Sequence, residues 1–145
     1  MLLLIQVIFM TLNRNDARIK AMTILYQINL YKKNKIEYNL DEVINDNLEQ
    51  SDDFVNTLVN GVLTNEEELD TLANKYLNNW SLSRLGLTDQ AIIRIALYEL
   101  LYTDTPPKVC IDEAIELAKD YSDDKVVGMI NGVLDKVYHN HKKSN

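Results

Sequence analysis

Basic side chains near the start of the chain are the groups best suited to bind a polyanion. Residues 13–35 carry six Lys or Arg and one Asp, whereas residues 37–70 carry eleven acidic residues and no Lys or Arg. Arg14 and Arg18 are four residues apart, so they share one face of a helix, and Lys20 follows closely. Such cations neutralise the phosphates of a nucleic acid. The alternative is a helix face that is merely solvated.

No group of residues supports catalysis. The sequence contains no glycine-rich phosphate loop and no GxSxG or HExxH pattern. Its single cysteine, Cys110, lies between Val109 and Ile111, which favours a buried structural thiol over a nucleophile. His139 and His141 are two residues apart, a spacing that does not place two metal ligands on one helix face. We therefore expect no enzyme, no metal site and no cofactor.

The composition indicates one soluble domain in a reducing, cytoplasmic compartment. The chain has 145 residues, 46% hydrophobic and 26% charged, and one cysteine excludes a disulfide framework. Residues 1–10 are apolar except for Gln6, but they are too few to span a bilayer, which takes about 20. We interpret residues 1–10 as an extension rather than a membrane anchor, residues 11–138 as one helical domain, and residues 139–145 as a fraying polar tail.

The spacing of apolar residues is helical almost throughout, and no segment alternates with a period of two. This pattern predicts an all-α fold of about seven helices. A capping-box sequence at Thr64 and Glu67 indicates a new helix or a kink. The predicted helices cover about 14–32 and 41–49, then begin after the caps Ser51, Thr88 and Ser122, at Thr64 and at the Pro106-Pro107 pair. Asn13 is the predicted cap of the first helix, the helix from Thr64 is expected to end near Trp80, and the helix from Thr88 near Tyr102.

Two features describe the expected packing. Residues 91–102 are apolar on nearly all sides, broken only by Arg94 and Glu99, as in the buried centre of a bundle. A Leu-Val-Asn-Gly-Val-Leu segment is echoed later by Met-Ile-Asn-Gly-Val-Leu, so Gly61 and Gly132 occupy equivalent places. Because a glycine within a helix costs on the order of 1 kcal/mol, we expect both to allow a close approach between helices. The alternative is a coincidental repeat, since short apolar segments recur easily.

Several stretches, in order, resemble the NusB family of transcription antitermination factors over about residues 11–138. They are Ala17-Arg18 with Leu25-Tyr26-Gln27, the connector Trp80–Gly86, Ala91–Leu100 (AIIRIALYEL), Pro107–Lys119 (PKVCIDEAIELAK) and Asn131–Lys136 (NGVLDK).

This resemblance implies both the fold and the function. The family fold consists of two perpendicular three-helix subdomains. Its members pair with NusE, a small ribosomal subunit protein, and bind the boxA element of nascent ribosomal RNA leaders. The assembly keeps RNA polymerase from terminating early. Because residues 37–70 should repel RNA, we expect this chain to bind weakly alone and NusE to add positive charge.

The resemblance also implies roles for single residues. Arg94 is a candidate RNA contact, with an ion pair at the edge of a buried helix as the alternative. Asp89 is a candidate NusE contact, with complementarity to the helix dipole as the alternative. Tyr26 is a further candidate for the partner, with a place in the core as its alternative.

Met129 is a candidate RNA contact on the last helix. It lies about 100° from the apolar stripe, on a face shared with Lys125, Gly132 and Lys136. Related factors carry Phe before the apolar-Asn-Gly motif, a side chain suited to stacking on a base. We therefore expect Met129 to be partly exposed, with Lys125 as a further RNA contact. The alternative is a methionine that fills a gap between helices.

Two other functions fit the same helices. One is a stand-alone relative of the RNA-binding domain of a ribosomal RNA cytosine methyltransferase, although no catalytic domain follows. The other is a self-associating structural protein without an RNA role. The sequence leaves open whether the chain forms a homodimer.

Overall fold

All regular elements of residues 12–142, the part of the chain that the computed structural model describes, are helical. This confirms the all-α prediction. The predicted extension at residues 1–10 and residues 143–145 lie outside the described residues. The elements are α2 (Arg14–Lys33), α3 (Leu40–Asn47), α4 (Asp53–Tyr76), a 3₁₀ turn η1 (Leu82–Arg84), α5 (Leu87–Tyr102), α6 (Pro107–Tyr121), α7 (Asp124–Val137) and a π-helical turn η2 (Tyr138–Lys142).

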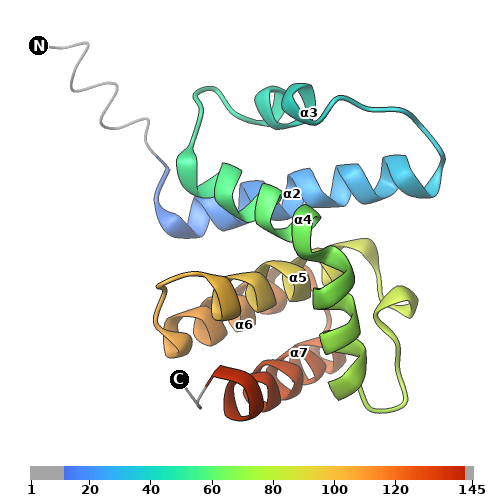
Figure 1. The fold of residues 1–145 in the computed structure, drawn as a ribbon, viewed down its shortest axis with the longest axis vertical. Helices are drawn as coiled ribbons and strands as arrows, with labels where there is room; N and C mark the ends of the chain where they lie inside the picture. Colours follow the sequence, from blue (N-terminus) through green and yellow to red (C-terminus); the bar gives the residue numbers. More distant parts are fainter. Residues whose placement is uncertain (1–11, 143–145) are drawn as a thin grey trace, which may run out of the picture.

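Helix α4 connects two groups of helices. In Figure 1, α2, α3 and the first half of α4 lie on one side, and α5, α6 and α7 lie on the other beside the second half of α4. Helix α4 packs against α2 in the first group and against α5 and α7 in the second. Helix α2 also packs directly on α5, so the two groups share one core.

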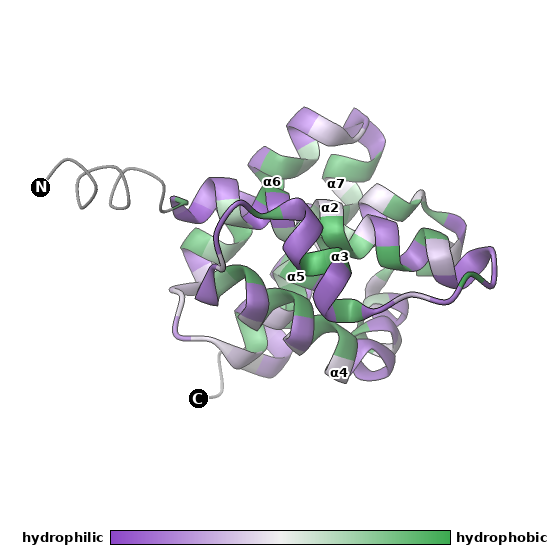
Figure 2. Ribbon diagram, turned by 90° about the horizontal axis from the view of Figure 1, so that it is seen from above, coloured by the Kyte–Doolittle hydropathy of each residue, from purple (hydrophilic) through white to green (hydrophobic). Residues whose placement is uncertain are grey.

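Helix α5 is the centre of that core, as its composition predicted. From Ala91 to Leu100 every residue except Tyr98 is buried, including the charged Arg94 and Glu99. Hydrophobic segments gather around α5, and hydrophilic ones follow the outer turns of the surrounding helices (Figure 2). Within residues 12–142, no helix combines the length and the apolar character needed to cross a membrane.

The predicted start of a separate helix at Thr64 is wrong, because residues 53–76 form one continuous helix. This is why six α-helices, rather than about seven, occupy the described part of the chain. The helical spacing of buried residues continues across this point, with Leu58 and Val62 before it and Leu69 and Ala73 after it. A continuous helix therefore buries more apolar surface than one that ends at Thr64. Figure 1 shows a bend in the middle of α4, which agrees with the predicted kink.

Most helix starts are shifted by one or two residues from the predicted caps. Asn13 caps α2 as predicted, accepting a hydrogen bond from the backbone N–H of Asp16 at 2.8 Å. The carboxylates of Asp52 and Asp123, rather than the hydroxyls of Ser51 and Ser122, cap α4 and α7. Helix α5 begins after Gly86 instead of Thr88 and has no side-chain cap.

The polar tail is more ordered than predicted over its first residues. Residues 138–142 form the π-helical turn η2. The imidazole Nε2 of His141 lies 2.9 Å from the hydroxyl of Tyr76 on α4, so this turn is held against the bundle.

The two Asn-Gly motifs have different structural roles. A Cβ atom added at Gly61 would lie 2.1 Å from the ring of Tyr98, because α5 approaches α4 closely there. The prediction for Gly61 is therefore confirmed. At Gly132 the same atom would meet nothing within 4 Å, so the predicted close approach at Gly132 is wrong.

We predict that Gly61→Ala lowers the free energy of unfolding by about 1–3 kcal/mol, because the methyl group must displace the half-buried Tyr98 ring. The matched variant Gly132→Ala should be neutral or stabilising by up to about 1 kcal/mol, since alanine favours a helix. Urea denaturation of both variants measures the difference. Equal effects on stability would contradict the assigned close approach at Gly61.

Candidate nucleic-acid interface

Arg14 is an exposed cation in the first turn of α2. The central carbon of its guanidinium group lies 3.9 Å from the ring centroid of Phe54, at the start of α4. This cation–π contact orients the guanidinium group but does not neutralise it. Among the described residues, no carboxylate lies within 4.0 Å of Arg14 to form an ion pair. Arg14 therefore keeps a charge that a phosphate could use.

Arg18 shares the helix face of Arg14, as predicted, but is buried, with 4% of its surface exposed. Its Nη2 atom lies 2.6 Å from Oε1 of Glu99 on α5, and its Nε atom is 3.1 Å from both carboxylate oxygens. A second carboxylate, that of Glu113 on α6, lies 3.9 Å from Nη1. The structure does not offer this guanidinium group to a ligand.

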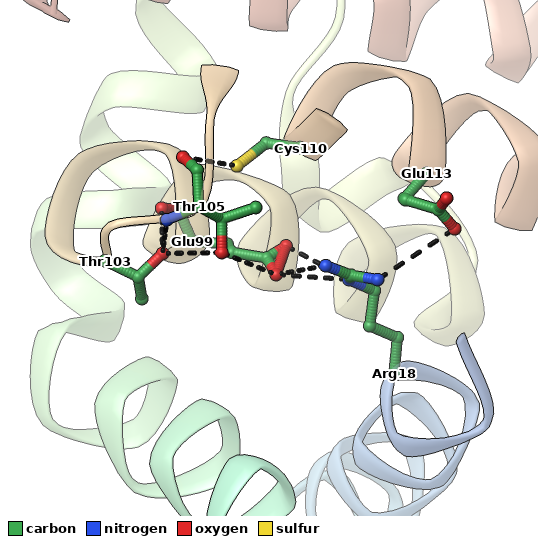
Figure 3. A network of polar contacts seen from close by, with 6 residues as sticks. All are labelled: Arg18, Glu99, Thr103, Thr105, Cys110 and Glu113. Atoms are coloured by element: carbon green, nitrogen blue, oxygen red, sulfur yellow. Dashed lines mark hydrogen bonds and ion pairs between the residues drawn. The ribbon is translucent and has the colours of Figure 1, made fainter. Parts of the chain in front are cut away.

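The carboxylate of Glu99 is the centre of a polar network (Figure 3). It receives the guanidinium group of Arg18 from one side and, at 3.5 Å, a hydrogen bond from the hydroxyl of Thr105. Thr105 lies in the turn between α5 and α6, where its carbonyl oxygen accepts a contact from the buried thiol of Cys110 at 3.6 Å. The expectation of a buried structural thiol at Cys110 is confirmed.

Arg94 is also buried, and it fits the ion-pair alternative rather than a direct RNA contact. Its Nε and Nη2 atoms donate to the two carboxylate oxygens of Asp70 at 2.7 and 2.9 Å. Its Nη1 atom lies 3.5 Å from the carboxylate of Glu66. This pairing ties α5 to the second half of α4. The predicted RNA contacts at Arg18 and Arg94 are therefore wrong, because both side chains are buried in ion pairs that join helices.

Lys20 lies half-buried on α2, six residues beyond Arg14, and points from a different side of the helix. Among residues 12–142 it forms no ion pair with an acidic side chain.

Helix α7 presents the predicted surface of two lysines and one methionine. Lys125 and Lys136 are exposed, Met129 is half-buried, and the space beside Gly132 is open. Met129 touches the edge of the core, so it is partly exposed as predicted.

Two residues that the sequence analysis assigned no role lie beside Lys125. Its ammonium nitrogen lies 4.5 Å from the ring centroid of Trp80, and the guanidinium carbon of Arg84 lies 5.0 Å from the same centroid. Trp80 and Arg84 are four residues apart in the connector between α4 and α5. That spacing is the only sign in the sequence that Trp80 and Arg84 could lie together. Their contact with Lys125 arises from the tertiary fold.

The structure does not bring Arg14 and Lys125 together. The cavity beside Arg14 is about 500 Å³ and includes Pro106 at the start of α6, whereas Lys125 follows the end of α6. Since α6 has 15 residues, it is about 22 Å long. A ligand that touches both cations must therefore be extended.

The two candidate partner contacts come from α2 and the start of α5, the helices that border a groove, although neither residue lines it. Tyr26 on α2 is 39% exposed, and Asp89 on α5 is half-buried and accepts a hydrogen bond from the hydroxyl of Ser122. The groove has a volume of about 310 Å³ and is lined by Asn29, Lys33, Ser83, Leu85, Gly86, Leu87 and Gln90. The amide nitrogen of Asn29 is buried without a hydrogen-bond partner, so it is a donor that a bound partner could satisfy.

A larger cavity, of about 1060 Å³, lies away from all of these residues, between α4 and the end of α5. Its wall includes Glu68 and the exposed Tyr102. A hydrogen bond to the carboxylate of Glu68 raises the pKa of Tyr102 to about 12. This cavity therefore contains none of the candidate RNA or partner contacts, although it is larger than the two cavities described above.

We predict that Arg18→Met lowers the free energy of unfolding by about 3–5 kcal/mol, because it leaves the buried carboxylate of Glu99 unpaired. The double variant Arg18→Met/Glu99→Leu should recover most of that loss. Lys108→Met, which breaks an exposed pair with Asp112, is the control and should cost about 0.5 kcal/mol or less. A double variant that is less stable than Arg18→Met in denaturant titrations would contradict this assignment.

Comparisons with known proteins agree with the geometry. The family model described as the NusB family matches residues 15–139. The transcription antitermination protein NusB of Staphylococcus haemolyticus is 42% identical over 130 residues, which cover 87% of this chain and 99% of that protein. These relatives fit the expectation of a factor that is not an enzyme.

Solved structures share the fold. The structure of T. maritima NusB superposes with a TM-score of 0.79 and 31% identity, covering 90% of this chain and 94% of that one. A complex of the antitermination factors NusB and NusE with dsRNA contains a chain that superposes with a TM-score of 0.74 and 26% identity, covering 88% and 97% of the two chains. The chain described here therefore belongs to the NusB family of transcription antitermination proteins.

Proposed function

We propose that this chain binds the boxA element of ribosomal RNA leader transcripts together with NusE and so prevents premature termination by RNA polymerase. Its place of action is the cytoplasm, in the antitermination complex that forms on the polymerase. Family membership supports this proposal, as does the complex of a NusB with NusE and dsRNA.

The proposal that this chain binds RNA is supported best by the surroundings of Arg14. It is exposed, has no carboxylate partner among the described residues and lies over the ring of Phe54. An arginine over an aromatic ring presents both a cation for a phosphate and a flat surface for a base. Lys20 adds charge nearby. On α7, Lys125 and Met129 are the further proposed contacts.

The partner has to supply part of the binding energy. Arg94 and Lys32 pair with the acids of α4 at Glu66 and Asp70, but Glu67 and Glu68 have no such partner within residues 12–142. These charges repel a phosphate backbone. NusE, bound to Tyr26 on α2 and to Asp89 on α5, would add contact area and positive charge.

We expect Arg14→Met to weaken RNA binding and to flatten its dependence on salt. For a single strand, each lost phosphate contact reduces the slope of log K against log salt concentration by about 0.7. Fluorescence anisotropy of a labelled boxA-type RNA, at several salt concentrations with NusE present, measures this slope. Lys119→Met is the control, because Lys119 is exposed on α6 and already pairs with Glu116.

An unchanged slope for Arg14→Met, or the same decrease for Lys119→Met, would contradict the assignment of Arg14. Equal RNA affinity of the wild-type chain with and without NusE at physiological salt would contradict the proposed role of the partner.

We expect Tyr26→Ala to weaken binding to NusE at least about tenfold while leaving thermal stability nearly unchanged, because exposed tyrosines are frequent centres of protein interfaces. Tyr102→Ala is the matched control, since Tyr102 is 44% exposed at the end of α5, in the wall of the cavity that lies away from Tyr26 and Asp89. Isothermal titration calorimetry with purified NusE measures both affinities. Equal affinities for the two variants would show that Tyr26 is not a partner contact.

A further inference from the structure

Trp80 lies at a fixed position in the connector between α4 and α5. Its backbone N–H donates to the carbonyl oxygen of Leu77 at 3.2 Å, and Asn79 before it adopts the left-handed conformation, with φ of 62°. Two residues later, the backbone N–H of Leu82 donates to the side chain of Asn74 on α4 at 2.7 Å. The half-buried indole thus belongs to a connector that two hydrogen bonds hold at the end of α4.

The two cations beside Trp80 are free of ion pairs in the described part of the chain. Lys125 and Arg84 are both exposed, and neither lies within 4.0 Å of a carboxylate. Asp123, the acid two residues before Lys125, directs its carboxylate to the backbone N–H of Val126 as the helix cap. This arrangement is the reverse of that at Arg18 and Arg94, which are buried against carboxylates.

The same surface continues along α7. Lys125 and Met129 are four residues apart and share a helix face, and the open space at Gly132 and the exposed Lys136 follow. From Lys125 to Lys136 this face extends for about 16 Å along the helix. A flat aromatic ring, three cations and a polarisable side chain therefore line one continuous strip.

We infer that Trp80, Lys125 and Arg84 form a stacking site for an unpaired base of single-stranded RNA. An indole is a sequence-tolerant surface for a base, and cations beside it neutralise the phosphates on either side of the stacked nucleotide. The long side chains of Lys125 and Arg84 can turn from the ring to the phosphates while Trp80 stays in place. This inference rests on the proposed RNA-binding function and places a second point of contact about the length of α6 away from Arg14.

The chain contains a single tryptophan, so its fluorescence reports on this site alone. The test titrates the full chain, in the presence of a NusE without tryptophan, with a single-stranded boxA-type oligoribonucleotide. Anisotropy of a label on the RNA measures binding independently. We expect the tryptophan emission to change with the same midpoint as the anisotropy, and a duplex of the same sequence to change it much less, because paired bases are not available for stacking.

Variants separate the ring from the charges. Trp80→Ala should weaken binding of the single strand at least about fivefold, and Trp80→Phe, which keeps an aromatic ring and protects the fold, should weaken it less. Lys125→Met and Arg84→Met should each reduce the slope of log K against log salt by about 0.7. Lys119→Met, an exposed lysine on α6, should change neither quantity.

Binding seen by anisotropy without a change in tryptophan emission, and with unchanged affinity of Trp80→Phe and Trp80→Ala, would overturn this inference and leave the proposed function intact. No binding of either RNA at low salt, with NusE present, would overturn both.

Discussion

The buried ion pair between Arg18 and Glu99 fixes how the two groups of helices meet. Arg18 comes from α2 and Glu99 from α5, 81 residues further along the chain, and Glu113 on α6 adds a second carboxylate. Burying these charges is costly, so the pair is stable only when all of its hydrogen bonds form together. The pair therefore disfavours any packing of α2 on α5 that differs from the one observed.

The position of Arg14 depends on that same contact. Because Arg18 holds α2 against α5, Arg14 one turn earlier lies at the edge of the core, over Phe54. The guanidinium carbon of Arg18 also lies 5.4 Å from the centroid of this ring. One aromatic residue of α4 thus adjoins both a structural arginine and an exposed one, and the structural arginine positions the exposed one.

The four arginines of the chain fall into two pairs with opposite surroundings. Arg18 and Arg94 are buried and bound to carboxylates, and each joins two helices. Arg14 and Arg84 are exposed and lie over aromatic rings. A guanidinium group over a ring remains charged and accessible, whereas one between carboxylates is neutralised, so only the second pair can attract RNA.

The sequence by itself determined the class of fold and the family. The helical spacing of apolar residues, the cap at Asn13 and the apolar segment around Ala91–Leu100 are local patterns, and each corresponds to a feature of the structure. The position of Met129 relative to the apolar stripe of α7 was also predicted, because angular position on a helix follows from residue number alone.

Only the tertiary structure decided which polar residues are accessible. Arg14 and Arg18 are equivalent in spacing, and so are Gly61 and Gly132 in their motifs, but the neighbours that distinguish them come from other helices. Arg18 is buried in an ion pair with Glu99, and the Tyr98 ring leaves no space for a side chain at Gly61. The contact of Lys125 with Trp80 likewise joins residues 45 positions apart in the sequence. Local periodicity carries no information about such contacts, because they depend on how complete helices pack against one another.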